Sequence, residues 1–252
     1  MTILLSIITV NLNNAKNLQR TINSLQCAFK HSQIECLFVD GKSNDKSVEI
    51  ACEFYPADLI ISESDEGIYD AMNKGLFRAR GSYLLWLNSG DELFSEVDLD
   101  GILHYLRQSS ADLISGKYIR RKHPNLLGSI HSPNVEHLPW GTLPHPATFF
   151  KKVTAINAGG YIKNYKVAAD RALIVSIYLA GGSIEIIPQT ISVFYLDGIS
   201  SKQPLVTMRE DLKINLLNNL IGRRLYFFGI SLYLIRKMKH SIRATAQQIL
   251  KF

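Results

Sequence analysis

Polar side chains that can bind nucleotides or metal ions directly follow two apolar runs in the first half of the chain. Asp40 follows Ile34–Val39, and the acidic pair Asp91 and Glu92 lies just after Tyr83–Leu87. A carboxylate such as Asp40 can accept hydrogen bonds from a ribose hydroxyl or a base N–H, or it can simply close a turn. An acidic pair can hold Mg²⁺ or Mn²⁺ together with substrate phosphates, or it can form a solvated turn. Both motifs therefore allow nucleotide chemistry without requiring it.

A third polar segment lies between these two and reads SDEGIYDAMNKG over residues 64–75. Asn73 and Lys74 fall on a predicted helix, where Lys74 can approach a phosphate. Asp65 and Glu66 precede that helix, and acidic side chains are favoured at a helix N-terminus for electrostatic reasons alone. The segment is thus compatible with a diphosphate site and with an ordinary helix start.

The elements that must position these residues alternate between strands and helices. Strands are predicted at Leu4–Val10, Ile34–Val39, Leu59–Ser62 and Tyr83–Leu87, and helices at Ala15–Phe29, at 45–55 and at Ile68–Arg80. Such strand-loop-helix units predict an α/β fold with a mostly parallel sheet and right-handed crossovers. Ligands of these sheets bind beyond the carboxyl ends of the strands. The polar residues after Val10, Val39 and Leu87 are therefore expected to converge.

In the second half of the chain the alternation of strands and helices is less regular. The pattern there predicts a strand over Asp112–Ile119, a helix over Ala168–Ala180 with Asp170 in its first turn, and one or two strands around Pro188 within Ile184–Tyr195. The stretch Arg120–Pro146 contains Pro, His and Gly and is typical of a substrate loop or lid. Beyond Gly198 the chain is expected to be helical and basic.

Several common classes of protein are excluded by motif and composition. The sequence has no P-loop, no dinucleotide-binding fingerprint, and neither the HExxH nor the GxSxG signature. The cysteines are three, Cys27, Cys36 and Cys52, without metal-ligand spacing, which argues against a disulfide framework or structural zinc. No apolar run reaches the 18 residues of a membrane span, and the start of the chain has no basic region typical of a signal peptide.

Three segments in this order resemble the family 2 glycosyltransferases with the GT-A fold: SIITVNLN, FVDGKSND and DEGIYDAMNKGLFRARGSYLLWLNSGDELF. The resemblance covers about residues 3–200. Within the family, the chain is most similar to the branch of bacterial exopolysaccharide and O-antigen enzymes that includes colanic-acid glycosyltransferases. It implies a GT-A, Rossmann-like α/β domain over residues 1–200, followed by a basic helical tail over 201–252. Residues 1–110 would bind a nucleotide sugar, usually a UDP-sugar, and residues 111–200 would bind the acceptor.

The resemblance also implies donor-binding and metal-binding positions. The implied donor contacts are Thr9, Val10, Asn11, Asp40, Asp65, Gly67, Asn73, Lys74, Asn88 and Ser89. Of these, Asp40 would contact the uridine, and Asn73 and Lys74 would approach the ribose or phosphates. Typical members carry Asp-x-Asp-Asp where this chain has Asn88-Ser89-Gly90-Asp91, so Asp91 is the expected ligand of Mg²⁺ or Mn²⁺.

The catalytic base is expected in the second half, because inverting transfer needs a carboxylate that removes the proton of the acceptor hydroxyl. The family places an Asp at a helix start after a Tyr-containing loop, and Asp170 after Tyr161 matches that position. Without the family, Asp170 would be an ordinary first-turn Asp. His145 and Trp140 are the implied acceptor contacts, although a structural His and a buried Trp would explain them equally.

The C-terminal tail carries most of the basic character of the chain. The whole chain has a net charge of +6, yet ten Lys and Arg but only two acidic residues lie in 202–252. Within it, Leu225–Ile235 is apolar and has Arg223-Arg224 and Arg236-Lys237 at its ends. Eleven helical residues span only about 17 Å, too short to cross a bilayer. The tail is therefore expected to lie on an anionic membrane surface, or to pack on the catalytic domain or a second copy of the chain.

These features predict a cytoplasmic inverting hexosyltransferase, peripheral on the inner membrane, that acts on a polyprenyl-diphosphate-linked saccharide. Two other interpretations stay open at this point. A nucleic-acid-binding protein would use the basic tail, although the acidic strand ends would repel phosphates in the absence of a metal. A degenerate GT-A scaffold without transferase activity would explain Asn88 and Gly90.

Overall fold

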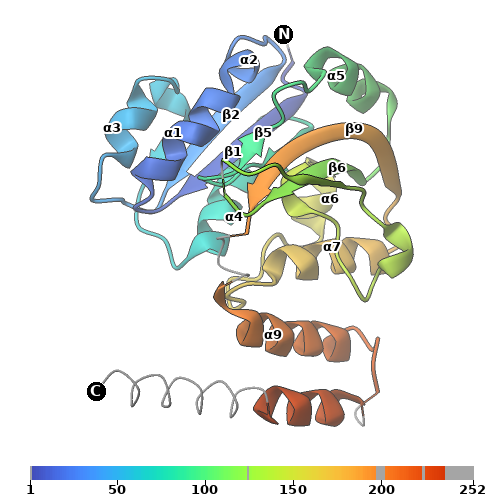
Figure 1. Ribbon diagram of the computed structural model, residues 1–252. Coiled ribbons are helices and arrows are strands. Elements are labelled where there is room, and N and C mark those ends of the chain that lie inside the picture. Colours follow the sequence, from blue (N-terminus) through green and yellow to red (C-terminus); the bar gives the residue numbers. More distant parts are fainter. Residues whose placement is uncertain (1, 124, 197–201, 223–224, 236–252) are drawn as a thin grey trace, which may run out of the picture. The chain divides into compact units, whose positions relative to one another are not determined.

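The computed structural model describes residues 2–123, 125–196, 202–222 and 225–235 of the 252-residue chain (Figure 1). The chain divides into two units, Met1–Asp197 and Gly198–Phe252. The boundary expected from the sequence, between residues 200 and 201, lies close to this division. The functions assigned to the two parts stay predictions.

Four parallel strands form the first half of the sheet. They are β1 (Leu5–Asn11), β2 (Ile34–Asp40), β3 (Ile60–Ser62) and β4 (Tyr83–Trp86), in the spatial order β3-β2-β1-β4. Every residue of β1, β2 and β4 is buried, which explains their continuous apolar runs. In the register of β1 with β2, Asn11 lies opposite Asp40. We call the carboxyl ends of β1, β2 and β4 the donor edge.

The second half of the sheet is mixed rather than parallel. Its strands are β5 (Glu92–Leu93), β6 (Leu113–Arg121), β7 (Ser129–His131), β8 (Thr148–Lys151) and β9 (Ile184–Tyr195). Strand β8 runs antiparallel to β4 and β6, whereas β9 is parallel to β6. The register of β6 with β9 shifts near Pro188, a residue that cannot donate to a ladder. Beyond this irregularity the long strand β9 curves round to pair with β5 (orange in Figure 1).

Helices cover both faces of this sheet (Figure 1). One face carries α1 (Ala15–Ser24), α2 (Gln26–Phe29), α3 (Ser47–Cys52) and α5 (Leu99–Gln108); the other carries α4 (Ile68–Arg78), α6 (Lys152–Asn157) and α7 (Ala169–Leu179). Three short 3₁₀ turns occupy Ala57–Leu59, Val135–His137 and His145–Ala147. The α/β class predicted from the sequence is confirmed.

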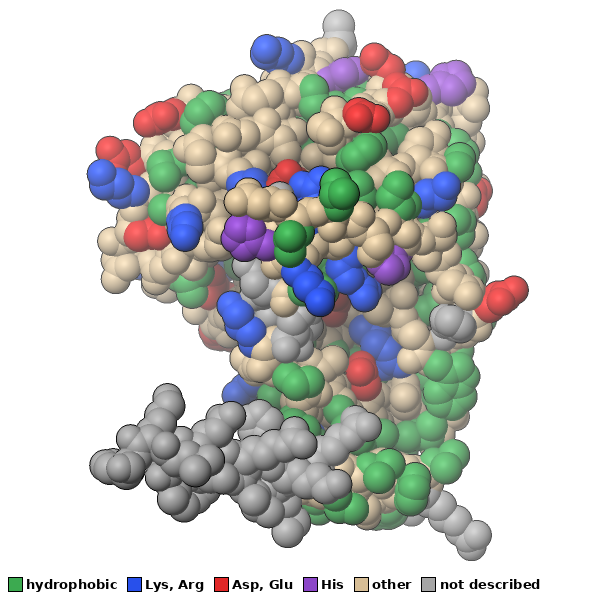
Figure 2. Space-filling model, in the orientation of Figure 1, with side chains coloured by type: hydrophobic (Ala, Val, Ile, Leu, Met, Phe, Trp, Pro, Cys, Tyr) green, Lys and Arg blue, Asp and Glu red, His purple; other side chains and the backbone are tan. Residues whose placement is uncertain are grey.

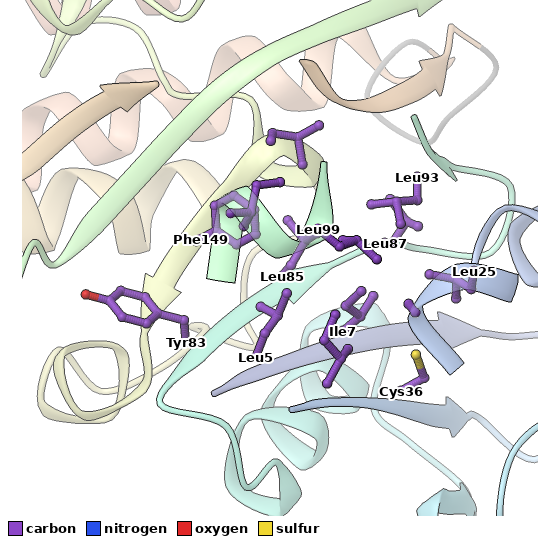
Figure 3. Packing of buried hydrophobic residues seen from close by; sticks show 14 of the residues in the cluster. Leu5, Ile7, Leu25, Cys36, Tyr83, Leu85, Leu87, Leu93, Leu99 and Phe149 are labelled. Atoms are coloured by element: carbon purple, nitrogen blue, oxygen red, sulfur yellow. The ribbon is translucent and has the colours of Figure 1, made fainter. Parts of the chain in front are cut away.

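A hydrophobic core cluster lies between the sheet and the first set of helices (Figure 3). Alternate strand residues point into it, among them Leu5 and Ile7 of β1 and Leu85 of β4, because successive side chains of a strand face opposite sides. Phe149 of β8 joins the same cluster and ties the mixed half of the sheet to the parallel half. The donor edge therefore stands on a rigid support.

Two glycines of the 64–75 segment determine how α4 lies on the sheet. Gly67 caps the helix at a φ of 119°, a conformation that favours glycine. Gly75 packs so closely on β1 that a Cβ atom there would lie 2.6 Å from Cγ2 of Ile8. Gly67 is favoured by its backbone conformation, and Gly75 is needed because a larger residue there would move the helix that carries Asn73 and Lys74.

The second unit contains α9 (Pro204–Leu217) and a helical segment over 225–235. Gly229 packs against Leu212 of α9, where a Cβ atom would lie 2.5 Å from the Leu212 side chain. The segment exposes the hydrophobic side chains of Leu225, Phe227, Phe228, Leu232, Leu234 and Ile235. Hydrophobic side chains are correspondingly prominent over this unit in Figure 2. In the described ranges of the chain, no helix is long and apolar enough to span a membrane. The predicted helical segment up to 252 lies partly outside the described residues.

Short elements account for most differences from the sequence-based expectation. Helices α5 and α6 and strand β8 were not expected, and the stretch 120–146 contains the end of β6, strand β7 and two 3₁₀ turns rather than a plain loop. Helix α6 and strand β8 are too short for a clear hydrophobic period, and they form because they pack on the sheet. Helix α5 is longer, and its buried residues Leu99, Ile102, Leu103 and Leu106 follow a helical period that was missed. The helix expected over Ala15–Phe29 is divided at Leu25 into α1 and α2.

Candidate functional site

Asp40 is the last residue of β2, at the donor edge, and is almost fully buried, with 1% of its surface exposed. Its carboxylate accepts hydrogen bonds from Asn11 Nδ2 at 2.9 Å, from the backbone N–H of Ser43 at 2.8 Å and from the Ser62 hydroxyl at 3.0 Å. The other amide atom of Asn11, Oδ1, is buried without a partner among the described residues. The structure thus provides a fixed carboxylate beside an acceptor atom that a ligand donor can satisfy.

The two other β1 residues predicted to bind the donor lie beneath this point. The Thr9 hydroxyl accepts a hydrogen bond from Tyr55 at 3.2 Å inside the core, and the Val10 carbonyl accepts the N–H of Ser89 at 3.0 Å. Their contacts here join β1 to the core and to the loop after β4. A direct contact of either with a nucleotide stays a prediction.

Asp65 reaches the same edge from the start of the 64–75 segment. Its Oδ1 accepts the N–H of Gly67 at 2.9 Å, and its carboxylate lies against the Cα of Gly41, directly after Asp40. The structure therefore brings Asp65 and Gly67 close to Asp40, which lies 25 and 27 residues before them in the sequence. Acidic oxygens at such an edge can accept hydrogen bonds from ribose hydroxyls or a base N–H.

Asn73 and Lys74 have other partners in this structure than a nucleotide. Asn73 pairs with the backbone of Tyr161, and Lys74 Nζ donates to the Ser64 carbonyl at 2.6 Å and pairs with Glu63 at 3.0 Å. Asn73 thus connects α4 to the loop before α7, and Lys74 closes the segment that contains Asp65. Their predicted approach to the ribose or phosphates stays a prediction.

The loop Asn88–Asp91 is held against α1 by side chains that sequence reasoning missed. Asn14 donates to the Ser89 carbonyl at 3.0 Å, Arg20 donates to the Gly90 carbonyl at 2.6 Å, and Thr21 donates to the Asp91 carbonyl at 2.7 Å. Gly90 adopts a φ of 113°, which favours glycine. Asn14 directly precedes α1, and Arg20 and Thr21 lie within it; their place on the first helix after β1 was the available signal.

Arg20 also connects this loop to the far end of the sheet. Its guanidinium forms an ion pair with Glu92 at 3.3 Å and lies 3.8 Å from the centre of the Tyr195 ring, whose hydroxyl donates to Glu92. Strand β9 ends at Tyr195, so the last strand braces the loop after β4. A cation-π contact of this kind holds the guanidinium plane over the ring.

The loop Asn88–Asp91 offers oxygen atoms of the kind that a divalent cation binds. Asn88 Oδ1 and Ser89 Oγ are buried without a hydrogen-bond partner in the part of the chain that the structure describes. In that same part, no group of three or more His, Cys, Asp and Glu side chains is arranged to hold a metal ion. Mg²⁺ binds through one or two carboxylates together with substrate phosphates and water, so Asp91 and Asn88 fit a metal that arrives with a diphosphate.

Asp170 occupies the first turn of α7. It lies near Tyr161, and both burial and the negative charge of Asp170 raise the pKa of the Tyr161 hydroxyl. The Tyr161 hydroxyl shares a hydrogen bond of 2.8 Å with His145 Nε2. The structure thus brings Asp170, Tyr161 and His145 into one group, and the role of Asp170 as catalytic base stays a prediction.

His145 is buried and neutral. Burial lowers the pKa of its imidazole to about 3, and its ring lies 5.5 Å from that of Trp86 in the core. A neutral imidazole hydrogen-bonded to Tyr161 can orient that residue, and it does not exchange protons near pH 7. Its predicted contact with the acceptor stays a prediction.

Trp140 is the exposed member of the predicted acceptor site, with 57% of its surface accessible. It lies in a turn between two buried residues, Leu138 and Leu143. An exposed indole offers a flat apolar face against which a sugar ring can stack. The alternative of a buried Trp140 is wrong; the buried tryptophan is Trp86.

Comparison with known sequences gives the family of the chain. The model of the family described as Glycosyl transferase family 2 matches residues 6–164. An uncharacterized glycosyltransferase of Mycobacterium tuberculosis is 30% identical over 182 residues, which cover 68% of this chain and 67% of the relative. A PGL/p-HBAD biosynthesis glycosyltransferase of Mycobacterium bovis is 31% identical over 171 residues, 66% of each chain. The chain thus spans about two thirds of the length of these relatives.

Comparison with solved structures gives the fold. The 1–349 fragment of Staphylococcus aureus TarS in complex with UDP-GlcNAc has a TM-score of 0.65 at 16% identity, covering 92% of this chain and 72% of its own. The mannosyltransferase PcManGT of Pyrobaculum calidifontis, in complex with GDP-Man and Mn²⁺, has a TM-score of 0.64 at 12% identity, covering 100% and 81%. The fold expected from the resemblance is confirmed, and the chain belongs to glycosyltransferase family 2.

Proposed function

We propose that the protein transfers a hexose, with inversion, from a UDP-sugar to a hydroxyl of a polyprenyl-diphosphate-linked saccharide in the biosynthesis of a bacterial surface polysaccharide such as O-antigen or exopolysaccharide. The observation that carries the donor part is the set of buried, partnerless oxygens at the donor edge: Asn11 Oδ1, Asn88 Oδ1 and Ser89 Oγ. Buried polar atoms are rarely left without a hydrogen bond, so their presence beside Asp40 and Asp91 favours a polar ligand there.

The choice of a nucleotide diphosphate sugar follows from the chemistry of this edge. Asp40 and Asp65 can receive hydrogen bonds from a nucleoside, and Asn88 with Asp91 can receive a cation that accompanies a diphosphate. Solved relatives of the same fold bind UDP-GlcNAc and GDP-Man, which agrees with a nucleotide-sugar donor. UDP is preferred because of the resemblance of the chain to UDP-sugar enzymes.

The mechanism is a single displacement. The acceptor hydroxyl oxygen attacks the anomeric carbon, its proton passes to the Asp170 carboxylate, and the bond between that carbon and the diphosphate oxygen breaks to release UDP. An α-linked donor gives a β-linked product. Mg²⁺ or Mn²⁺ held by Asp91 and Asn88 would neutralise charge on the leaving diphosphate. Tyr161, fixed by His145 and Asn73, maintains the loop that leads to Asp170.

The second unit supports a membrane location. The segment 225–235 packs Gly229 against Leu212 of α9 and exposes several hydrophobic side chains, and its sequence neighbours are Arg223-Arg224 and Arg236-Lys237. A short apolar helical surface with basic flanks suits the interface of an anionic bilayer. The proposed location is therefore the cytoplasmic face of the inner membrane, where a polyprenyl-diphosphate acceptor would be found. A second copy of the chain is the alternative occupant of this apolar surface.

Nucleic acid is not proposed as a partner. On the face of the molecule drawn in Figure 2, Lys and Arg side chains are interspersed with Asp and Glu side chains. The acidic groups at the donor edge would also repel a phosphate backbone. A protein of this class would need a continuous basic surface.

A donor screen tests the proposed function. Release of UDP or GDP is measured from a panel of nucleotide sugars with Mn²⁺ and a lipid-diphosphate-linked GlcNAc acceptor, and binding of each donor is measured by calorimetry in parallel. Acceptor-dependent UDP release from at least one UDP-sugar is expected. Donor binding without any release would favour the inactive scaffold, and the absence of donor binding with Mn²⁺ present would contradict the proposal.

A further inference from the structure

Arg171 follows Asp170 in the first turn of α7 and is buried, with 5% of its surface exposed. A buried guanidinium requires hydrogen-bond acceptors, because its charge is otherwise costly to remove from water. The acceptors come from a segment 30 residues earlier in the chain. Nη2 donates to the carbonyl of Pro139 at 2.8 Å and to that of Trp140 at 3.1 Å, and Nε donates to the carbonyl of Gly141 at 3.1 Å.

Three consecutive carbonyl groups therefore converge on one side chain. The segment they belong to, residues 139–141, lies between the buried anchors Leu138 and Leu143 and exposes the Trp140 side chain. The planar, forked guanidinium suits this arrangement, whereas an ammonium group is a point charge on a flexible stem. Arg171 thus determines where the backbone of Trp140 lies relative to the start of α7.

The position of Trp140 matters because Asp170 is the neighbour of Arg171. An indole that stacks on the acceptor sugar must be held in place. If the indole were loosely positioned, the sugar would lose the orientation that brings its reacting hydroxyl to the base. Aromatic side chains provide this contact through a large, flat apolar face. Arg171 holds the backbone of Trp140 and directly follows Asp170, the proposed base, in the sequence.

We propose that Arg171 is a positioning residue that holds Trp140 beside Asp170 as the wall against which the acceptor sugar stacks. This inference rests on the proposed function, because it takes Asp170 to be the base of a sugar transfer. Arg171 acts through Trp140 and touches neither the donor nor the reacting atoms. The ligand class that this wall selects is a saccharide with an apolar ring face.

Trp140 fluorescence tests the positioning step without any substrate. The chain has two tryptophans, and Trp86 has no exposed surface, so iodide quenching reports on Trp140. In Arg171→Lys the anisotropy of the emission is expected to fall and the iodide quenching constant to rise, with unchanged circular dichroism. The matched control is Arg107→Lys, an exposed arginine bonded to Gln33 at 2.7 Å. Equal anisotropy and quenching in Arg171→Lys and wild type would overturn the proposal.

Kinetics then test the effect on the acceptor. With the donor and acceptor that give turnover, Arg171→Lys is expected to raise the acceptor KM about tenfold, equivalent to about 1.4 kcal/mol, with kcat and the donor KM within about twofold. Trp140→Ala should give a similar rise, and Trp140→Phe should largely restore the acceptor KM. In the double variant, Arg171→Lys should add little to Trp140→Ala, because both act through one contact.

The outcomes separate this inference from the proposed function. If wild type binds no nucleotide sugar, the proposed function fails, while the fluorescence result still tests whether Arg171 positions Trp140. If wild type is active and the two substitutions have additive effects on the acceptor KM, Arg171 does not act through Trp140 and the inference is wrong.

Discussion

Asn73 pairs with the backbone of Tyr161 through both atoms of its side-chain amide. Nδ2 donates to the Tyr161 carbonyl at 2.7 Å, and Oδ1 accepts the Tyr161 N–H at 2.8 Å. The next residue back, Gly160, is so close that a Cβ atom would lie 2.6 Å from Asn73 Oδ1. Helix α4, which contains most of the 64–75 segment, is thereby fixed to the loop that leads to Asp170.

Loss of this pairing should destabilise the protein. In Asn73→Ala the Tyr161 N–H and carbonyl lose their partners, and we expect the free energy of unfolding to fall by about 1–3 kcal/mol. Urea denaturation provides the measurement. Asn23→Ala, at an exposed position of α1, is the matched control and should change stability by less than about 0.5 kcal/mol. Equal effects of the two substitutions would show that the pairing contributes nothing.

Removing the proposed base should abolish transfer and spare donor binding. Asp170→Asn keeps the size of the side chain but cannot accept the proton, so acceptor-dependent UDP release is expected to fall by roughly 100-fold to 10,000-fold. The donor dissociation constant, measured by calorimetry, should stay within about twofold of wild type. Asp100→Asn changes an exposed first-turn Asp of α5 and should leave both quantities unchanged. Retention of more than a few per cent of wild-type transfer by a folded Asp170→Asn would refute the base assignment.

The Mn²⁺ requirement of the activity should depend on how many carboxylates the loop after β4 carries. Asn88→Asp places a second carboxylate next to the position of Asp91, so the Mn²⁺ concentration that gives half-maximal UDP release is expected to fall by about tenfold. Asp91→Asn should raise that concentration by at least as much. Both are measured by Mn²⁺ titration after EDTA treatment. An unchanged Mn²⁺ requirement in both variants would mean that this loop does not hold the metal.

The buried His145 should make stability depend on pH in a defined window. Its folded pKa of about 3 lies below the ordinary value of 6.5, so below pH 6.5 the unfolded chain takes up a proton that the folded protein does not. The contribution of His145 to the free energy of unfolding is fully present above pH 6.5. It declines as the pH falls, by about 1.4 kcal/mol between pH 7.5 and 5.5. The pKa values of Glu35 and Asp112 are lowered from 4.5 and 3.8, so protonation of these two carboxylates reduces the free energy of unfolding only at more acidic pH.

Urea denaturation of His145→Gln at the two pH values tests this assignment. The variant should lose most of the difference in unfolding free energy between pH 7.5 and 5.5. His104→Gln, at an exposed position of α5, is the control and should keep it. If His145→Gln shows the wild-type difference, the pH dependence has another source.

Charge on the apolar side of the second unit should weaken membrane binding. Phe228 and Phe77 are each 63% exposed, and they lie in the second and the first unit respectively. Phe228→Asp is expected to reduce binding to vesicles with anionic phospholipid by about tenfold or more, since burial of one such side chain contributes about 1.5–3 kcal/mol. Phe77→Asp is the matched control and should bind as wild type. Unchanged binding of Phe228→Asp, with a shift from dimer to monomer in sedimentation, would assign this surface to a second copy of the chain.

The sequence predicted most reliably what depends on local pattern. The runs that became β1, β2 and β4 are apolar throughout because central parallel strands are buried on both faces, and the polar residues that follow them mark the donor edge. The helix start at Asp170 was also visible, since its first turn and period are local. Short elements such as α6 and β8 were missed because a few residues carry no distinct period.

By itself the sequence indicated the α/β class and placed Asp40, Asp91 and Asp170 after strands or at a helix start, because strand burial and helix starts leave marks within a few residues. The family followed from the resemblance of three segments to known enzymes. The tertiary structure alone decided which partners the polar side chains have. Asn73 was expected at the donor and pairs with Tyr161, and Arg171, unnoticed in the sequence, collects three carbonyls from residues 139–141. Such contacts join residues that are 30 to 88 positions apart, and hydrogen-bond partners at that separation are set by how the helices and loops pack on the sheet.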